Sequence, residues 1–367
     1  MGDKKRIAIV FGGQSSEHEV SRFSAEAVLR NIDREKFDVA MIGITKDGRW
    51  LAYDGPLELI GTGEWQALAE TGQKSNQPLL SAGAAMVAAE KDNRNIDVVF
   101  PVLHGCNGED GTIQGLFEMA GIPYVGCGVL GSALGMDKAY AKIIFEKEGI
   151  PQGKYLVFSR KQIARETEQI LTRVEEVLTY PCFVKPSNAG SSVGVSKAHD
   201  RSELEAALQL AARYDRRILV EEFMDGREAE CAVLGNDEPV ASTVGEVVPC
   251  NEFYDYEAKY MSGDSSEVII PANLSQETID KIRYYSVKAF KALDCSGLAR
   301  ADFFVNKDSG EVFINEINTM PGFTSISMYP KLWDYSGIAY SDLIDRLIDL
   351  GLERFHDLSE RKISHQG

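Results

Sequence analysis

The stretch Ser296–Pro330, SGLARADFFVNKDSGEVFINEINTMPGFTSISMYP, contains two apolar runs separated by a cluster of turn-forming residues. The runs are Leu298–Val305 and Glu311–Ile317, and the cluster between them is Asn306–Gly310. Two such runs around a polar, glycine-containing cluster predict a β-hairpin.

Polar side chains converge on one part of the predicted hairpin. Because side chains alternate between the faces of a strand, Arg300 and Asp302 share one face of the first strand, and Glu316 and Asn318 share one face of the second. Folding about the turn brings Asp302 roughly opposite Asn315 and Glu316. Carboxylate and amide oxygens suit Mg²⁺. The arginine beside them is suited to phosphate or to developing oxyanion charge.

The alternative is a solvated hairpin face that carries ordinary surface charges. The second strand is followed at once by an irregular, glycine-containing loop, Pro321–Ser325. Loops at strand ends commonly carry function, so the metal site is the favoured interpretation.

Composition limits the possible functions. At 367 residues the chain is long enough for two or three domains, and its formal charge of −17 argues against a nucleic-acid surface. Residues 1–10 lack the apolar core of a signal peptide, and no apolar run is long enough to span a bilayer. The six cysteines are scattered without paired metal spacing, which predicts reduced thiols. We therefore expect a cytoplasmic protein with no membrane or nucleic-acid partner.

The N-terminal segment predicts the start of a doubly wound α/β domain. A strand, Arg6–Phe11, leads through a glycine-containing turn into a helix that continues to about Leu29. The GxGxxG fingerprint of dinucleotide-binding folds is absent. Glu17 in this turn has two interpretations of equal weight. Either the turn is an ordinary helix cap, with Ser15 or Ser16 as the N-cap and Glu19 in the first helical turn, or the carboxylate of Glu17 receives a substrate ammonium.

A second glycine-rich loop follows a second strand of this domain. The strand Ile96–Leu103 is followed by HGCNGEDG at 104–111 and by a helix, Thr112–Ala120. Ligands bind at such strand ends in open α/β sheets, so His104 is equally interpreted as a structural or a functional histidine. The weakly patterned residues 55–95 predict a surface insertion.

The middle of the chain predicts a small α/β module with a phosphate-binding flap. A helix over Ser132–Glu148 and a strand over Pro181–Lys185 precede the small-residue loop Pro186–Val195, whose N–H groups are suited to phosphate oxygens. Lys185 ends an apolar strand, where a lysine is costly unless it meets an anion. Lys138 would ordinarily be an exposed helix lysine.

The remaining elements are predicted less specifically. A helix (Ser202–Arg213) precedes a strand (Arg216–Glu222) that is either a plain core strand or part of a wall for a flat base. Residues 246–267 predict a long loop, often a lid, in which Lys259 and Tyr260 are lid contacts or packing residues. Helices are predicted at 276–293 and 340–353.

Taken together, these motifs resemble the D-alanine–D-alanine ligases of the ATP-grasp superfamily over residues 6–350. The motifs are GGQSSEHEVS (12–21), HGCNGEDGTIQG (104–115), MDK (136–138), KPSNAGSSVGVSK (185–197), FYDYEAKY (253–260), ARADFF (299–304) and NEINTMPGFTSISMYP (315–330). The resemblance implies an N-terminal doubly wound parallel α/β domain followed by a two-domain ATP-grasp fold, of classes α/β and α+β. The implied boundaries are 1–131, 132–223 for the small central domain, and 224–367 for the domain with the metal site and lid.

The resemblance also implies roles for individual residues. Glu17, linked through Ser191 to Tyr260, would hold the ammonium of the first substrate, with His104 beside it. Arg300 and the Gly322 N–H would stabilise the oxyanion, while Ser327 and Met328 would line the second subsite. Residues expected at ATP are Lys138, Lys185, Ser191, Ser192, Val193, Glu221, Phe223, Met224, Glu228 and Lys259, and those expected at Mg²⁺ or Mn²⁺, with two ions, are Asp302, Glu316 and Asn318.

The implied reaction is ATP-dependent ligation of two D-alanine molecules through a D-alanyl phosphate, for peptidoglycan synthesis. The family further implies a homodimer. Tyr260 in the EAKY segment resembles the alanine-forming members, and apolar Met328 suits a methyl group rather than D-serine. Two alternatives are a catalytically silent nucleotide-binding regulator and a dinucleotide-dependent oxidoreductase. The first would be expected to lack a metal or lysine position, and the second lacks its fingerprint.

Overall fold

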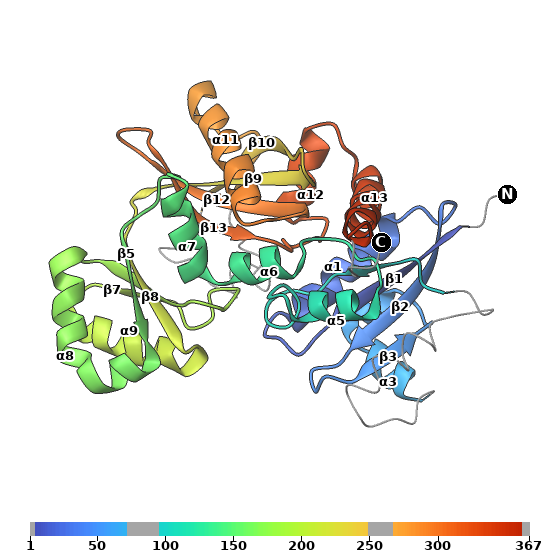
Figure 1. The fold of residues 1–367 in the computed structure, drawn as a ribbon, viewed down its shortest axis with the longest axis horizontal. Coiled ribbons are helices and arrows are strands. Elements are labelled where there is room, and N and C mark those ends of the chain that lie inside the picture. The colour runs from blue at the N-terminus through green and yellow to red at the C-terminus, as the bar shows by residue number, and fades with distance from the viewer. Residues whose placement is uncertain (1–3, 72–94, 249–266, 362–367) are drawn as a thin grey trace.

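The computed structural model describes residues 4–71, 95–248 and 267–361. Three β-sheets follow one another along the chain (Figure 1). The first sheet is rich in parallel pairs, whereas the second and third are antiparallel. In the described ranges, no helix has the length and apolar character needed to cross a membrane.

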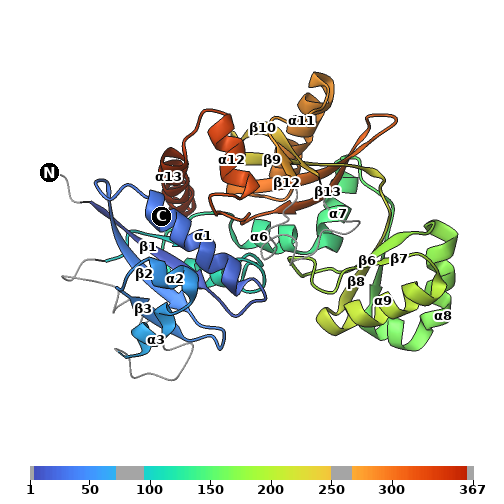
Figure 2. The same ribbon diagram turned by 180° about the vertical axis from the view of Figure 1, so that it is seen from behind.

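The first sheet has strand order β3-β2-β1-β4 and carries helices on both faces (Figures 1 and 2). β1 pairs in parallel with β2 and β4, and β3 is antiparallel to β2. Side chains of β1 alternate between two core clusters, with Ile7 and Ile9 on the side of α1 and Ala8 and Val10 on the side of α5. The elements are β1 (Lys5–Gly12), α1 (His18–Asn31), β2 (Phe37–Ile44), β3 (Trp50–Tyr53), β4 (Val98–Pro101) and α5 (Thr112–Ala120).

The described part of the expected surface insertion lies mostly at the surface but is folded and anchored to the first sheet. Residues 55–71 contain α2 (Glu58–Thr62) and α3 (Trp65–Glu70). Trp65 is only 1% exposed, and its ring centroid lies 4.9 Å from that of Phe11. The sequence did not predict these two helices or the buried tryptophan that anchors the segment to the sheet. Residues 72–94 lie outside the described ranges.

The expected single helix over Ser132–Glu148 is two helices, α6 (Val129–Met136) and α7 (Lys138–Lys147). Asp137 separates them with an extended backbone, and its side chain accepts a hydrogen bond from the N–H of Tyr140. Asp137 therefore acts as an N-cap, which favours a new helix start. As a result, Lys138 stands at the first position of α7.

The second sheet has strand order β5-β8-β6-β7, and α8 and α9 pack on it. The predicted flap lies between β6 and β7, as expected. The elements are β5 (Tyr155–Ser159), α8 (Arg160–Val177), β6 (Cys182–Pro186), β7 (Ser196–Ala198), α9 (Arg201–Tyr214) and β8 (Arg217–Glu222).

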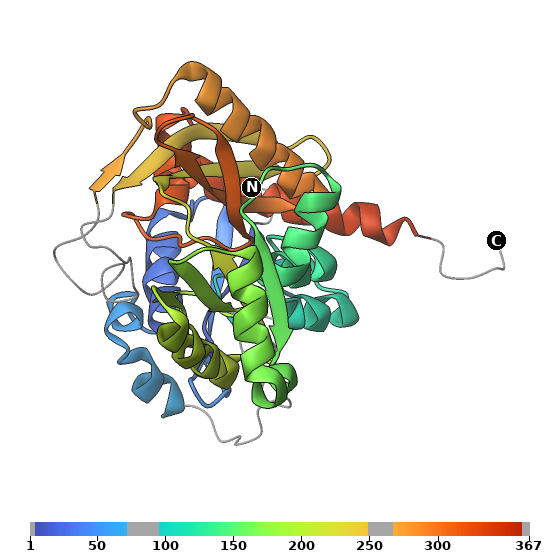
Figure 3. The same ribbon diagram turned by 90° about the vertical axis from the view of Figure 1, so that its left-hand side faces the viewer.

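The third sheet has strand order β11-β10-β9-β12-β13. Cys231 and Val233 of β9 pack in the cluster that includes α11, whereas Ala232 and Leu234 pack with α12 and α13. α13 also contacts β4 of the first sheet, and its C-terminal end extends away from the body of the molecule (Figure 3). The elements are β9 (Gly226–Gly235), β10 (Val240–Val248), β11 (Glu267–Ile269), α11 (Gln276–Ala292), β12 (Gly297–Asn306), β13 (Val312–Asn318), α12 (Met328–Tyr335) and α13 (Tyr340–Ser359).

The predicted hairpin is confirmed as β12 and β13. The strands pair antiparallel, with Arg300 opposite Asn318 and Asp302 opposite Glu316. A register shift lies between Asp302 and Phe303. The alternation of side chains and the position of the turn were therefore sufficient to predict which polar groups meet.

Candidate active site

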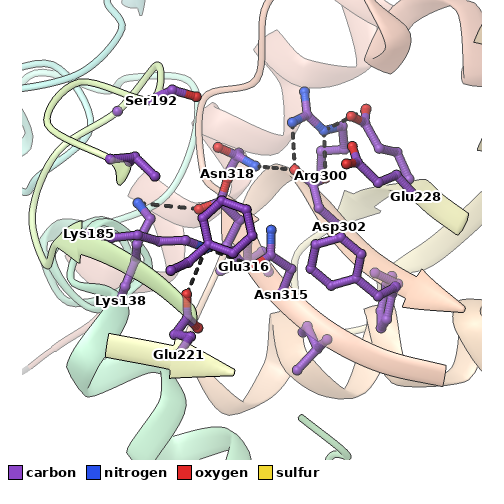
Figure 4. A pocket seen from close by; sticks show the side chains of 18 of the residues that line it. Lys138, Lys185, Ser192, Glu221, Glu228, Arg300, Asp302, Asn315, Glu316 and Asn318 are labelled. Carbon is purple, nitrogen blue, oxygen red and sulfur yellow. Dashed lines mark hydrogen bonds and ion pairs between the residues drawn. The ribbon is translucent and has the colours of Figure 1, made fainter. Parts of the chain in front are cut away.

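A cavity of about 440 Å³ lies where loops of the first sheet meet the second and third sheets. Its walls come from the turn after β1, the loop after β4, the start of α7, the flap, and strands β8, β9, β12 and β13. Figure 4 shows the part of the cavity around the hairpin, the lysines and the flap. Most of the residues predicted from the sequence line it: Glu17, His104, Lys138, Lys185, Ser191, Ser192, Glu221, Phe223, Met224, Glu228, Arg300, Asp302, Glu316, Asn318 and Gly322.

Not every predicted site residue lines the cavity. Val193, Ser327 and Met328 are not among its lining residues. Ser327 precedes α12 as its N-cap, and Met328 is buried in the core cluster of that helix. Lys259 and Tyr260, with the expected lid, lie outside the described residues.

Asp302, Glu316 and Asn318 lie together at the hairpin. Asn318 Nδ2 donates to Asp302 Oδ2 over 2.9 Å, and Glu316 Oε2 lies 3.2 Å from Lys138 Nζ. No group of three or more acidic, histidine or cysteine side chains in the described ranges is arranged to hold a metal by itself. Two carboxylates and an amide nevertheless fit Mg²⁺ bound together with nucleotide, because this ion takes few protein ligands and completes its shell with phosphate oxygens and water.

Arg300 is held between two carboxylates. Its Nε and Nη2 donate to Asp302 Oδ1 and Oδ2, each over 2.7 Å, and Nε also lies 2.8 Å from Glu230 Oε2. Two parallel bonds fix the plane of the guanidinium. The group therefore has a defined orientation in the cavity (Figure 4).

Two lysines approach the cavity from different elements. Lys138 Nζ donates to the Ala189 carbonyl over 2.9 Å as well as pairing with Glu316. Lys185 Nζ lies 2.7 Å from Glu221 Oε2 and donates to Asn315 Oδ1 over 3.3 Å. Burial alone would lower the pKa of Lys185, but the carboxylate of Glu221 keeps it above its ordinary value. Lys185 is therefore charged, and both lysines lie where they can bind anions.

Glu221 is paired on both of its oxygens. Lys142 Nζ lies 2.6 Å from Oε1, and Lys185 occupies Oε2. Burial by itself would raise the pKa of Glu221, but the two ammonium groups lower it to about 2. Glu221 is therefore an ionised carboxylate in a buried position.

Part of the flap has a backbone conformation that residues other than glycine rarely adopt. Ser191 and Ser192 have positive φ angles of 48° and 59°. Non-glycine residues in this region cost free energy and are concentrated at ligand-binding sites. Ser191 Oγ donates a hydrogen bond to Glu17 Oε1, which joins the flap to the turn after β1.

Glu17 lines the cavity, and one oxygen of its carboxyl group accepts no hydrogen bond from the described residues. It is the N-cap residue of α1, but its side chain makes no capping hydrogen bond. Within the described part of the chain, Oε2 is buried and has no hydrogen-bond partner. A Cβ at Gly105 or Gly190 would lie 2.5 or 2.3 Å from this oxygen. A buried acceptor without a partner is costly, which favours the ligand interpretation over the cap.

His104 has both ring nitrogens engaged. Nδ1 donates to the Met320 carbonyl over 2.9 Å, which leaves Nε2 to accept from Ser24 Oγ over 2.9 Å. Burial lowers the pKa of His104, so the ring is neutral. His104 thus ties the loop after β4 to the loop after β13 while it lines the cavity.

Among the lining residues that sequence reasoning missed are three buried or half-buried charged side chains, Glu109, Lys142 and Glu230. Glu109 accepts from the Gly105 N–H over 2.9 Å, and burial, with the charge of Glu17, raises its pKa to about 8. Its place in the loop 104–111 was an available signal. Lys142 follows Lys138 by one helical turn, so the two share a face of α7. Glu230 had no signal, because its role appears only when β9 pairs with β12.

Comparisons with known proteins identify the family of the chain. Residues 6–127 match the family model "D-ala D-ala ligase N-terminus", and residues 144–349 match "D-ala D-ala ligase C-terminus". The chain is 67% identical to the D-alanine–D-alanine ligase of Ruminiclostridium cellulolyticum, with 96% of this chain and 97% of that protein covered. It is 64% identical to the ligase of Acetivibrio thermocellus, with 97% and 98% covered.

Two solved structures are similar over nearly the whole chain. The VanG D-Ala:D-Ser ligase of Enterococcus faecalis is 42% identical with a TM-score of 0.83, covering 95% of this chain and 100% of that one. The D-alanine–D-alanine ligase of Coxiella burnetii is 34% identical with a TM-score of 0.82, covering 98% and 97%.

Proposed function

The chain belongs to the D-alanine–D-alanine ligase family, and on this premise we propose that its cavity joins two D-alanine molecules at the expense of ATP. The dipeptide D-alanyl-D-alanine is a precursor for peptidoglycan. The observation that carries the proposal is the convergence, in one cavity, of Glu17 from the first sheet with Arg300 and the carboxylates of the third.

The first D-alanine binds through its ammonium group to Glu17. The unpartnered Oε2 of this buried side chain supports the assignment, and Ser191 holds the other oxygen in place. A zwitterionic amino acid bound in this way directs its carboxylate away from Glu17. Lys138 and Arg300 line the same cavity and are available to that carboxylate.

ATP phosphorylates the carboxylate of the first D-alanine, which becomes an acylphosphate. Lys138, Lys185 and the flap residues Ser191–Gly194 bind the phosphates, while Glu221, Phe223, Met224 and Glu228 receive the adenosine. Mg²⁺ or Mn²⁺, as two ions on Asp302, Glu316 and Asn318, would supply charge neutralisation at the phosphate oxygens. The donor set of the hairpin and the charged lysines support these roles.

The amine of the second D-alanine attacks the acylphosphate. Arg300 and the Gly322 N–H stabilise the oxyanion of the tetrahedral intermediate, and phosphate leaves. The fixed plane of the guanidinium supports this role for Arg300, because donors that are already oriented need no reorganisation during the reaction.

The remaining assignments rest on the family. Ser327 and Met328 form the second subsite, and Lys259 and Tyr260 belong to a lid that excludes water from the acylphosphate. The domains are 1–131, 132–223 and 224–367, a division supported by the confinement of each sheet to one of these ranges. The enzyme acts in the cytoplasm, where ATP is available.

The protein also forms a homodimer in this proposal. Exposed apolar side chains on the neighbouring helices α5 and α6 support a protein contact there, and Met119 is 91% exposed. Single exposed hydrophobic residues need no explanation, but several of them on two helices that contact each other favour an interface. The group consists of Leu116, Met119, Val129 and Leu130.

The test measures phosphate release from Mg·ATP with D-alanine alone, with L-alanine, and with D-alanine mixed with D-serine or D-lactate. Products are resolved by mass. Release with D-alanine alone and the mass of D-alanyl-D-alanine is expected. A product that forms only in a mixture would contradict the second subsite. No D-alanine-dependent release from folded protein that binds ATP would contradict the ligase activity.

A further inference from the structure

Lys142 is almost completely buried although it carries a charge. It is 3% exposed, and its side chain is more covered than those of Lys138 and Lys185. Its Nζ lies 2.6 Å from Glu221 Oε1 and 5.6 Å from the centre of the Tyr155 ring. A buried ammonium is costly unless it is paired, so this position requires a reason.

Lys142, Glu221 and Lys185 together form a buried cluster of two cations and one anion. Each carboxylate oxygen of Glu221 forms an ion pair with one of the two lysines. Glu221 is faced by Lys142 from α7 and Lys185 from β6, while Glu316 of β13 and Glu228 of β9 act on Lys185. The cluster therefore carries one more positive charge than Glu221 needs.

The surplus cation matters when nucleotide binds. In the proposed function, on which this inference rests, Lys185 binds phosphate oxygens of ATP. If Lys185 moves away from Glu221, Lys142 is the remaining lysine partner of the carboxylate. With Lys142 in place, a neutral buried pair remains. Without it, the carboxylate is left uncompensated or must take up a proton.

We propose that Lys142 is a positioning residue for nucleotide binding, which keeps Glu221 ionised and in place so that Lys185 is free to bind the phosphates of ATP. Lys142 acts through Glu221 and does not itself contact the phosphates. Because it lies one turn after Lys138, the start of α7 supplies one lysine to the phosphates and another to the carboxylate that pairs with Lys185.

The test is calorimetric titration of the full-length protein with Mg·ATP in the absence of D-alanine. Wild type, Lys142→Met, Lys142→Arg and Lys147→Met, an exposed position on the same helix, are compared from about pH 6 to pH 9 in buffers of different ionisation enthalpy. For Lys142→Met we expect binding at least about tenfold weaker at the upper pH, with uptake of up to about one proton per ATP beyond wild type. Lys142→Arg and Lys147→Met should follow wild type.

The sign of the pH effect separates this role from a structural one. Proton uptake by Glu221 makes binding to Lys142→Met weaken as pH rises. Equal weakening at all pH values, without proton uptake, would overturn the proposal, as would unchanged binding. Wild-type protein that does not bind Mg·ATP would instead remove the proposed function and this inference with it.

A second comparison does not depend on the folding of Lys142→Met. The double variant Lys142→Met/Glu221→Gln leaves no unpaired buried charge in this pair. We expect it to bind Mg·ATP within about threefold of Glu221→Gln alone, without pH dependence, because Lys142 has no role once the carboxylate is absent. A double variant more than about tenfold weaker than Glu221→Gln would show that Lys142 acts independently of Glu221 and would overturn the proposal.

Discussion

Arg300 and Asp302 form a forked ion pair within one strand, in which Nε lies 2.7 Å from Oδ1 and Nη2 lies 2.7 Å from Oδ2. The proposed oxyanion donor is therefore oriented by a proposed metal ligand. A lysine at this position keeps the charge but cannot form the two parallel bonds.

The first prediction concerns this fork. Arg300→Lys should lower kcat by about 100- to 1000-fold, the usual cost of losing one oxyanion donor. Steady-state kinetics measure the effect, and Arg173→Lys on the exposed face of α8 is the control. A variant with near-normal kcat would rule out the assigned role.

The second prediction concerns Glu17. Glu17→Gln should raise the KM for D-alanine about 10- to 100-fold, because a charge-assisted bond to the ammonium is lost, and should leave the Kd for Mg·ATP nearly unchanged. The control is Glu19→Gln, which changes a carboxylate that pairs with Lys46 on the surface. An equal loss of ATP binding would show that Glu17 acts on the flap instead.

The third prediction concerns the metal. Chelation should abolish ligation without changing the Tm of the nucleotide-free protein, and Mg²⁺ should raise the Tm only when ATP is present. Glu316→Gln should raise the Mg²⁺ concentration needed for half-maximal activity about tenfold or more, whereas Glu311→Gln, at the exposed turn end, should not. Chelator sensitivity of the nucleotide-free Tm would indicate a separate metal site.

The fourth prediction concerns Glu109, whose pKa is raised to about 8 by burial and by Glu17. The folded protein holds this proton up to a higher pH than the unfolded chain does, so Glu109 lowers stability as pH rises from about 4.5 through 8. Glu109→Gln removes that loss, and its Tm relative to wild type should increase between pH 5 and pH 9, which thermal melts at about these values measure. Glu205→Gln, at an exposed position on α9, is the matched control. A constant difference for Glu109→Gln would refute the argument.

The fifth prediction concerns the anchor of the segment 55–71. Trp65→Ala should lower the free energy of unfolding by about 3–5 kcal/mol, as expected for a large side chain removed from a core. Denaturant titration measures it, and Leu68→Ala, at a position 45% exposed on the same helix, should have a small effect. Similar losses for both variants would argue against a specific anchoring role for Trp65.

Parts of the site were predictable because short-range rules determine them. The hairpin register follows from alternation and turn chemistry, so the meeting of Asp302 with Glu316 could be predicted. The roles of the lysines were harder to predict, because the residues around Lys142 in the sequence form the same helical pattern as those around an exposed lysine. Lys142 is buried because β8, about 80 residues away in the sequence, places Glu221 next to its ammonium group.

Other features could not be predicted, because they depend on tertiary contacts that no local sequence pattern indicates. The break at Asp137 lies in a sequence that is otherwise favourable to one continuous helix, and it is stabilised by Ser187 and Arg217 from the second sheet. Trp65 is buried only because Gly43 of β2 leaves room for its ring. The roles of Ser327 and Met328 came from family resemblance alone, and neither lines the cavity.

The order in which the cavity walls occur along the chain has a consequence for synthesis. Glu17 is made near the beginning, the flap near the middle, and Gly322 near the end. A nascent chain that ends before β13 possesses the carboxylate proposed for the amino acid and the lysines proposed for the nucleotide, but not Glu316 or Asn318. Ligase activity is therefore a property of the finished polypeptide, and truncated translation products would lack the hairpin that completes the site.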